Sequence, residues 1–185
     1  MALIAQAELE QRLNRSLTAN EVALFPLVNA ALQNYIEDMI GASLEPVSET
    51  LRLYDGGVQH LAIDPCSAIS EVTYRDENQL VDDTIDPDDY TAYPANKTIK
   101  TQITARFGRF VKGYNNIGVR AKFSIADDTK TVAIIKRSLL EILASEIESN
   151  DNIAKESIEG YSVEYVKSET KDQLDRIGYL FPRII

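Results

Sequence analysis

The chain of 185 residues has no tryptophan, one cysteine and one histidine. A single cysteine, Cys66, cannot form a disulfide within the chain, which suits a reducing compartment. Because His60 is the only histidine, a catalytic triad or a Cys/His pair would have to use it, and no other part of the sequence converges on these two residues. We therefore interpret His60 as a strand-edge residue and Cys66 as a small buried thiol.

Long apolar runs and targeting signals are also missing. No stretch approaches the roughly 18 apolar residues of a membrane span. Glu8 and Glu10 follow so soon after Met1 that we expect no signal peptide. Spacings typical of a metal cluster, a phosphate loop or a repeat do not occur. Without tryptophan, the sequence gives little support for glycoside hydrolysis by paired carboxylates. We expect no enzymatic activity and no cofactor.

The charge balance is acidic, because 29 Asp and Glu residues stand against 19 Lys and Arg residues, giving a net charge of −10. Such a surface repels phosphate, so tight binding of duplex DNA is not expected, although a channel through which DNA slides could carry this sign. The hydrophobic content of 44% is ordinary for a globular protein. A chain of this length can bury a core as one domain, or as one domain with an insert.

Helical patterns stand at both ends of the chain. We predict helices over residues 4–14, 18–40 and about 130–149, with a capping box at Thr18 and Glu21 and a stop at Gly41. Apolar residues at three- and four-residue steps give the second helix one face, made of Val22, Phe25, Val28, Ala31, Tyr35 and Met39. The apolar stripe of the third helix is expected to pack against this face. A strand over 162–166 and a short helix over 169–180 follow.

Between the helices the hydrophobic period changes to two. Residues 48–126 predict five to seven short strands, which we expect to be antiparallel because their connections are too short for helical crossovers. The fold-class prediction is therefore α+β with a helical bundle core. N-terminal helices (1–47) would pack on a long C-terminal helix with its docking segment (127–185), and an antiparallel β-rich lobe (48–126) would be inserted between them.

Two charged stretches are candidates for a channel or interface loop. The acidic stretch consists of Asp82, Asp83, Asp86, Asp88 and Asp89. It is favoured as a solvated loop over a calcium site, because Pro87 interrupts the spacing that calcium loops use. The basic stretch consists of Arg106, Arg109 and Lys112, mixed with Phe107, Phe110 and Tyr114. This mixture suits stacking on single-stranded nucleic acid, but an ordinary hairpin is the favoured interpretation.

Six of the last seven residues are apolar, although chain ends are usually polar. The apolar set is Tyr179, Leu180, Phe181, Ile184 and Ile185. Side chains of this kind need cover, which either the same chain or a neighbouring protein supplies.

Several segments together resemble the head–tail connector (adaptor, or head-completion) proteins of long-tailed bacteriophages. They follow a pair of N-terminal helices and include Leu51 to Gly57, Ile69 to Tyr74, Asp88 to Tyr90 and Asn116 to Ala121. The most specific is Glu-Ser-Ile-Glu-Gly-Tyr-Ser-Val at 156–163, just after the long helix.

This resemblance implies a structural virion protein without catalysis. It implies a homo-oligomeric ring of about a dozen copies that binds the portal protein and extends the DNA channel. The C-terminal region, with the apolar set at 179–185, would dock on the portal, and a downstream stopper or tail-completion protein would bind the other end. The expected location is the head–tail interface of the virion, after synthesis in the host bacterial cytoplasm. DNA would pass without specific binding, and no membrane would be involved.

Two other classes stay open. A ligand- or carbohydrate-binding module on a helical stalk would use Tyr90, Tyr93, Phe107 and Tyr114 as contact rings. A metal-dependent hydrolase would use the acidic stretch.

Overall fold

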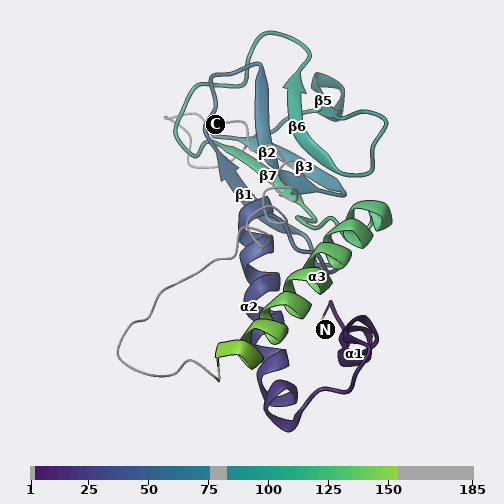
Figure 1. The fold of residues 1–185 in the computed structure, drawn as a ribbon. Coiled ribbons are helices and arrows are strands. Elements are labelled where there is room, and N and C mark those ends of the chain that lie inside the picture. The colour runs from purple at the N-terminus through teal and green to yellow at the C-terminus, as the bar shows by residue number, and fades with distance from the viewer. Residues whose placement is uncertain (1–2, 76–82, 154–185) are drawn as a thin grey trace. The chain divides into compact units, whose positions relative to one another are not determined.

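The structure is a computed structural model that describes residues 3–75 and 83–153. Its elements run in the order α1 (Gln6–Leu13), α2 (Ala19–Ile40), β1 (Thr50–Tyr54), β2 (His60–Cys66), β3 (Ile69–Tyr74), β4 (Asp83–Thr84), a 3-10 turn η1 (Pro87–Asp89), β5 (Tyr90–Tyr93), β6 (Lys100–Ala105), β7 (Ile117–Ala121) and α3 (Thr129–Ile153) (Figure 1). The strand predicted over 162–166 and the helix over 169–180 lie outside the described residues.

The described chain divides into two compact units. Among the described residues, 3–39 and 130–153 form a helical unit, and Ile40–Thr129 form a β unit. The predicted segment boundaries, after residues 47 and 126, stay predictions.

The β unit consists of two antiparallel sheets that share one core. The strand order is β1-β7-β3-β4 in the first sheet and β2-β6-β5 in the second. Buried side chains from both sheets meet in the core, including Leu61 and Ile63 on β2, Ile103 on β6, and Ile117 and Val119 on β7. The antiparallel arrangement predicted for this region is confirmed, and the sheets bury their inner faces on each other as in a β-sandwich.

A proline explains an irregularity in the second sheet. Pro65 lies within β2, and the pairing of β2 with β6 shifts register between Ala62 and Cys66. Proline has no backbone N–H to continue the ladder, so strands tolerate it at an edge or a bulge. In agreement with this rule, β2 is the edge strand of its sheet.

One cation connects several parts of the β unit. The guanidinium of Arg52, on β1, lies 4.1 Å from the centroid of the Phe123 ring. It donates a hydrogen bond to the Gly41 carbonyl at 2.7 Å and pairs with the Asp64 carboxylate of β2, also at 2.7 Å. The Tyr54 hydroxyl donates to the same carboxylate at 3.1 Å. The planar, multi-donor guanidinium thus joins the two sheets to the segment that follows α2.

In the helical unit, α1 meets α3 through two ion pairs. Arg12 donates from Nε to both carboxylate oxygens of Glu141 at 3.0 Å, and the Lys136 ammonium lies 2.8 Å from Glu8 Oε1. These side chains are half-exposed, and ion pairs of this kind contribute only about 0–1 kcal/mol each. They align the two helices without forming a core.

The predicted helical-bundle core is wrong. The described residues form a mixed α/β structure with more strands than helices, and α3 is not packed by α1 and α2 as the core of a bundle. The physical reason lies in the orientation of α2. Its buried positions are Glu21, Phe25, Asn29, Ile36 and Ile40. Two of these are polar, while Val22 and Tyr35 of the predicted inner face are exposed.

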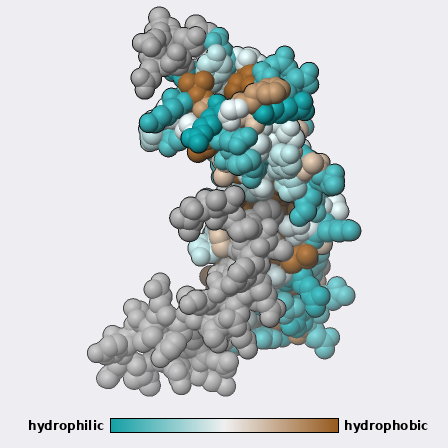
Figure 2. Space-filling view, turned by 90° about the horizontal axis from the view of Figure 1, so that it is seen from above, coloured by the Kyte–Doolittle hydropathy of each residue, from teal (hydrophilic) through white to brown (hydrophobic). Residues whose placement is uncertain are grey.

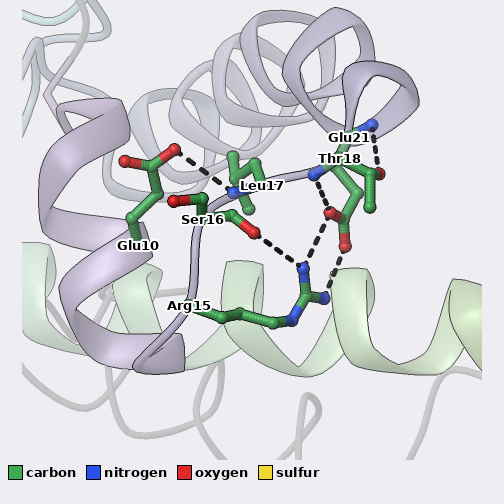
Figure 3. Close-up of polar contacts among 6 residues, drawn as sticks. All are labelled: Glu10, Arg15, Ser16, Leu17, Thr18 and Glu21. Atoms are coloured by element: carbon green, nitrogen blue, oxygen red, sulfur yellow. Dashed lines mark hydrogen bonds and ion pairs between the residues drawn. The ribbon is translucent and has the colours of Figure 1, made fainter.

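Hydrogen bonds close the connection between α1 and α2, and they confirm the predicted capping box (Figure 3). The Thr18 N–H donates to Glu21 Oε2 at 2.6 Å, and the Glu21 N–H donates to Thr18 Oγ1 at 3.4 Å. Arg15 donates from its two terminal nitrogens to the Glu21 carboxylate at 2.9 and 2.6 Å. The Leu17 N–H donates to Glu10 at 3.2 Å. At the other end of α2, Gly41 has a φ of 74°, the left-handed conformation of a helix stop.

These bonds lower the pKa of Glu21 from 4.5 to about 2. The Arg15 hydrogen bond is the largest cause, burial opposes it, and the Thr18 backbone adds to it. A carboxyl whose pKa is depressed by folding stabilises the folded state above its unfolded pKa. This stability is lost as the pH falls from about 4.5 toward 2.

We predict that Glu21→Gln lowers the free energy of unfolding at pH 7 by about 1–3 kcal/mol, because it removes the charged partner of Arg15 at a side chain that is 7% exposed. Urea unfolding measured between pH 7 and pH 2.5 should show the difference from the unsubstituted protein shrinking below pH 4.5. The matched control, Glu148→Gln on an exposed position of α3, should change stability by less than about 0.5 kcal/mol. If the effect of Glu21→Gln did not change with pH, the stabilising role of the ionised Glu21 carboxylate beside Arg15 would be contradicted.

Candidate functional site

The segment between β6 and β7 is held firmly at its base. Phe110 is buried in the β core; its N–H donates to the Val58 carbonyl at 2.9 Å and its carbonyl accepts from the Gly57 N–H at 3.0 Å. The buried Asn116 amide donates to the Val111 carbonyl at 2.9 Å. A side chain at Gly56 would meet the Val111 carbonyl oxygen at 1.8 Å, so only glycine allows this close approach.

Above this base, the segment presents two aromatic rings and three cations to solvent. Phe107 is 78% exposed and Tyr114 is 83% exposed. Arg106, Arg109 and Lys112 are exposed as well, and no acidic residue occurs between 106 and 114. We call residues 106–114 the aromatic loop. Exposed rings beside cations are the composition of contact surfaces for protein partners or for nucleic-acid bases.

The described part of the acidic stretch lies beside the start of the aromatic loop. The Asp86 carboxylate accepts from the Asp88 N–H at 2.8 Å and so begins the turn η1. The Asp89 carbonyl accepts from the Arg106 N–H at 2.8 Å, which brings the two charged stretches together. Asp83 lies on β4, and Asp82 lies outside the described residues. Among residues 3–75 and 83–153, no three His, Cys, Asp or Glu side chains are placed to hold a metal ion.

An exposed apolar face runs along α2. Leu24, Leu27, Ala31 and Tyr35 follow one another at three- and four-residue steps, and all four are exposed. Leu27 is 68% exposed. The fifteen residues from Val22 to Ile36 include no charged side chain. We call this set the α2 face. Apolar side chains appear as brown patches on the mostly teal surface in Figure 2.

A smaller apolar pair lies on the outer side of the first sheet. Leu51 and Leu53 are exposed on the edge strand β1. They flank Gly118 of β7, where an added side chain would meet Leu51 at 3.2 Å and Thr73 Oγ1 at 2.4 Å. The absence of a side chain at Gly118 therefore lets the two leucines lie flat beside Thr73.

The two residues that catalysis would have needed do not meet. His60 is exposed at the beginning of β2, an edge strand, with Nδ1 3.1 Å from Thr104 Oγ1. Cys66, at the end of the same strand, is fully buried, and burial followed by the nearby Asp64 charge raises the pKa of its thiol to about 12. The interpretation of a strand-edge histidine and a buried thiol is confirmed.

The four rings of the proposed ligand-binding alternative do not form one surface. Tyr90 packs against the β core, and burial raises its pKa. Tyr93 lies three residues further along β5, and side chains at odd spacings point to opposite faces of a strand. Only Phe107 and Tyr114 belong to the same exposed loop.

Some of the site residues predicted from the sequence lie outside the described part of the structure, and some exposed apolar residues were not predicted. The docking set Tyr179, Leu180, Phe181, Ile184 and Ile185 lies outside the described residues. Arg106, Arg109 and Lys112 are exposed in the aromatic loop, and their role in a channel or interface stays a prediction. The sequence analysis did not predict the α2 face, because it placed Ala31 and Tyr35 on the inner side of the helix and gave Leu24 and Leu27 no role. An uncharged run of fifteen residues is the signal that could have revealed it.

Two comparisons, with protein-family models and with curated proteins, found no match. No protein-family model matches the chain, and no curated protein matches it at a significant level. No helix in the described ranges is long and apolar enough to cross a membrane.

We predict that Phe107→Ala changes the free energy of unfolding by less than about 0.5 kcal/mol, because the ring is exposed. Phe110→Ala, three residues away, should cost about 3–5 kcal/mol because it leaves a cavity in the β core. Urea unfolding of both variants gives the comparison. Similar losses for the two would mean that Phe107 also belongs to the core.

Proposed function

We propose that this protein is a subunit of the head–tail connector ring of a tailed bacteriophage, a structural role without catalysis. The observation that carries the proposal is the presence of exposed apolar surfaces on separate elements: the α2 face, the aromatic loop and the leucine pair of β1. Soluble monomers rarely leave several such surfaces uncovered. A ring subunit needs contacts with two neighbours and with proteins above and below the ring.

The order of the elements also supports the proposal. Two helices precede the strands and one long helix follows them, which is the order on which the resemblance to connector proteins rests. In this role the ring binds beneath the portal protein, extends its channel, and offers the other end to a stopper or tail-completion protein. The location that follows is the virion, at the head–tail interface.

The charge distribution suits a channel component. The whole chain carries −10. Because the aromatic loop contributes three positive charges and no negative one, the remainder carries −13. A predominantly acidic wall lets DNA pass without tight binding to phosphates, and cations confined to one loop limit attraction to that loop.

The direct test is electron microscopy of the purified protein mixed with the portal ring of the same virus. The expected result is a second ring stacked coaxially on the portal. Portal rings that stay bare at protein concentrations well above those in the virion would refute the proposal.

A truncation tests the predicted docking segment. Removal of residues 178–185 should leave the circular dichroism spectrum and the melting temperature nearly unchanged while abolishing stacking on the portal. The matched control replaces the exposed Lys97 with alanine in the full-length chain and should retain stacking. Normal stacking of the truncated protein would show that docking uses another surface.

A further inference from the structure

We propose that the α2 face binds the exposed side of α3 on a second copy of this chain. The inference rests on the proposed ring and names the surfaces that join neighbouring subunits. Both surfaces belong to the helical unit. Each copy therefore carries one of each, and a contact between unlike surfaces can continue from copy to copy until a ring closes.

The first surface has the composition of an interface core. Along the α2 face, Leu24, Leu27, Ala31 and Tyr35 are exposed over a stretch without a charged side chain, from Val22 to Ile36. At about 1.5 Å per residue this stretch is about 22 Å long. Cores of protein interfaces are depleted of charges and enriched in tyrosine and other large apolar residues. Water is a poor solvent for such a face, so a partner is needed to cover it.

The second surface is the exposed side of the first three turns of α3. Ile134 is 51% exposed, and Ala133 beside it is exposed as well. Lys130 and Arg137, one turn before and one turn after Ile134, are also exposed. Two cations therefore flank an apolar centre on this helix.

The charges of the two helices are complementary. Helix α2 has no basic residue; Glu21 pairs with Arg15 of the same chain, and Glu37 and Asp38 lie near the end of the helix. From Thr129 to Leu140, α3 has no acidic residue; Lys136 pairs with Glu8 of the same chain, and Lys130 and Arg137 are exposed. This opposition favours α3 of another copy over a second α2, because two α2 faces would bring together helices of the same charge.

The spacing allows the contact in either direction of the helices. Glu37 and Asp38 follow Tyr35 by two and three residues. When Ile134 packs near Tyr35, Lys130 lies four residues before Ile134 and Arg137 lies three residues after it. The acidic end of α2 therefore meets Arg137 in one orientation and Lys130 in the other.

The size of the contact explains how it would behave. A single helix face of this length buries on the order of a few hundred Å² per partner, well below the roughly 800 Å² of a stable pairwise complex. Two copies alone are therefore expected to associate weakly. In a closed ring each copy makes the contact twice, so all contacts support one another.

Cysteine crosslinking gives a specific test, because Cys66 is buried and does not compete. Full-length Ala31→Cys protein, whose exposed substituted position lies one turn from Tyr35, and full-length Ile134→Cys protein are treated with a short bismaleimide, separately and as an equal mixture at high concentration. The expected result is a covalent dimer in the mixture at about ten times or more the yield of either protein alone. The unsubstituted protein reports the background from Cys66.

A matched control and a charge variant test the assignment further. Lys97→Cys, an exposed position in the β unit, should give only background dimer when mixed with Ile134→Cys. Adding Lys130→Glu and Arg137→Glu to the Ile134→Cys partner should lower the dimer yield several-fold. Circular dichroism checks that each variant is folded.

Each other outcome overturns the inference. Dimers from Ala31→Cys alone would show that two α2 faces meet. A mixture without dimers would show that the α2 face is covered by another protein or by another part of the same chain. The portal test is independent of these results. Stacking on the portal without crosslinks would refute the contact between α2 and α3 but keep the connector role. Crosslinks without stacking would keep the contact but refute the connector role.

Discussion

A single half-buried arginine, Arg52, connects the parts of the β unit. Its guanidinium stacks on Phe123, pairs with Asp64 and donates to the Gly41 carbonyl. These partners come from an opposite sheet and from two connecting segments, so one side chain fixes the relation of parts that are distant in sequence. An isolated salt bridge at a surface contributes little. Here the ring contact and the backbone acceptor add to the ion pair, and Tyr54 supports the carboxylate.

Two exposed apolar surfaces of the described residues lie on well-anchored backbone. The aromatic loop is held by Phe110 and Asn116 while Phe107 and Tyr114 extend into solvent. The α2 face likewise belongs to a helix whose opposite side is buried. In both places a fixed backbone presents apolar side chains, which limits the entropy lost when a partner binds. This arrangement suits a protein that assembles with several neighbours.

Local signals in the sequence predicted local structure well. The capping box at Thr18 and Glu21, the stop at Gly41 and the antiparallel strands follow from short-range chemistry. The packing of α2 did not follow. The apolar spacing places Val22 and Tyr35 on the inner face, whereas the structure buries Glu21 and Asn29. There the Glu21 carboxylate pairs with Arg15, and the Asn29 side-chain NH2 donates to the Ile4 carbonyl. The alternation in β1 likewise places Leu51 and Arg52 on opposite faces of the strand. It does not show that Arg52, rather than Leu51, is on the more buried face.

The helical unit takes its residues from two separated parts of the chain, while the β unit is continuous from Ile40 to Thr129. During translation α1 and α2 leave the ribosome ninety residues ahead of α3. At typical elongation speeds this delay is about 5–20 s. The second sheet is complete once Ala105 has been made, and the first once β7 ends at Ala121, still before α3 begins at Thr129. The nascent chain therefore completes its middle first, and the ends join only when the last helix emerges.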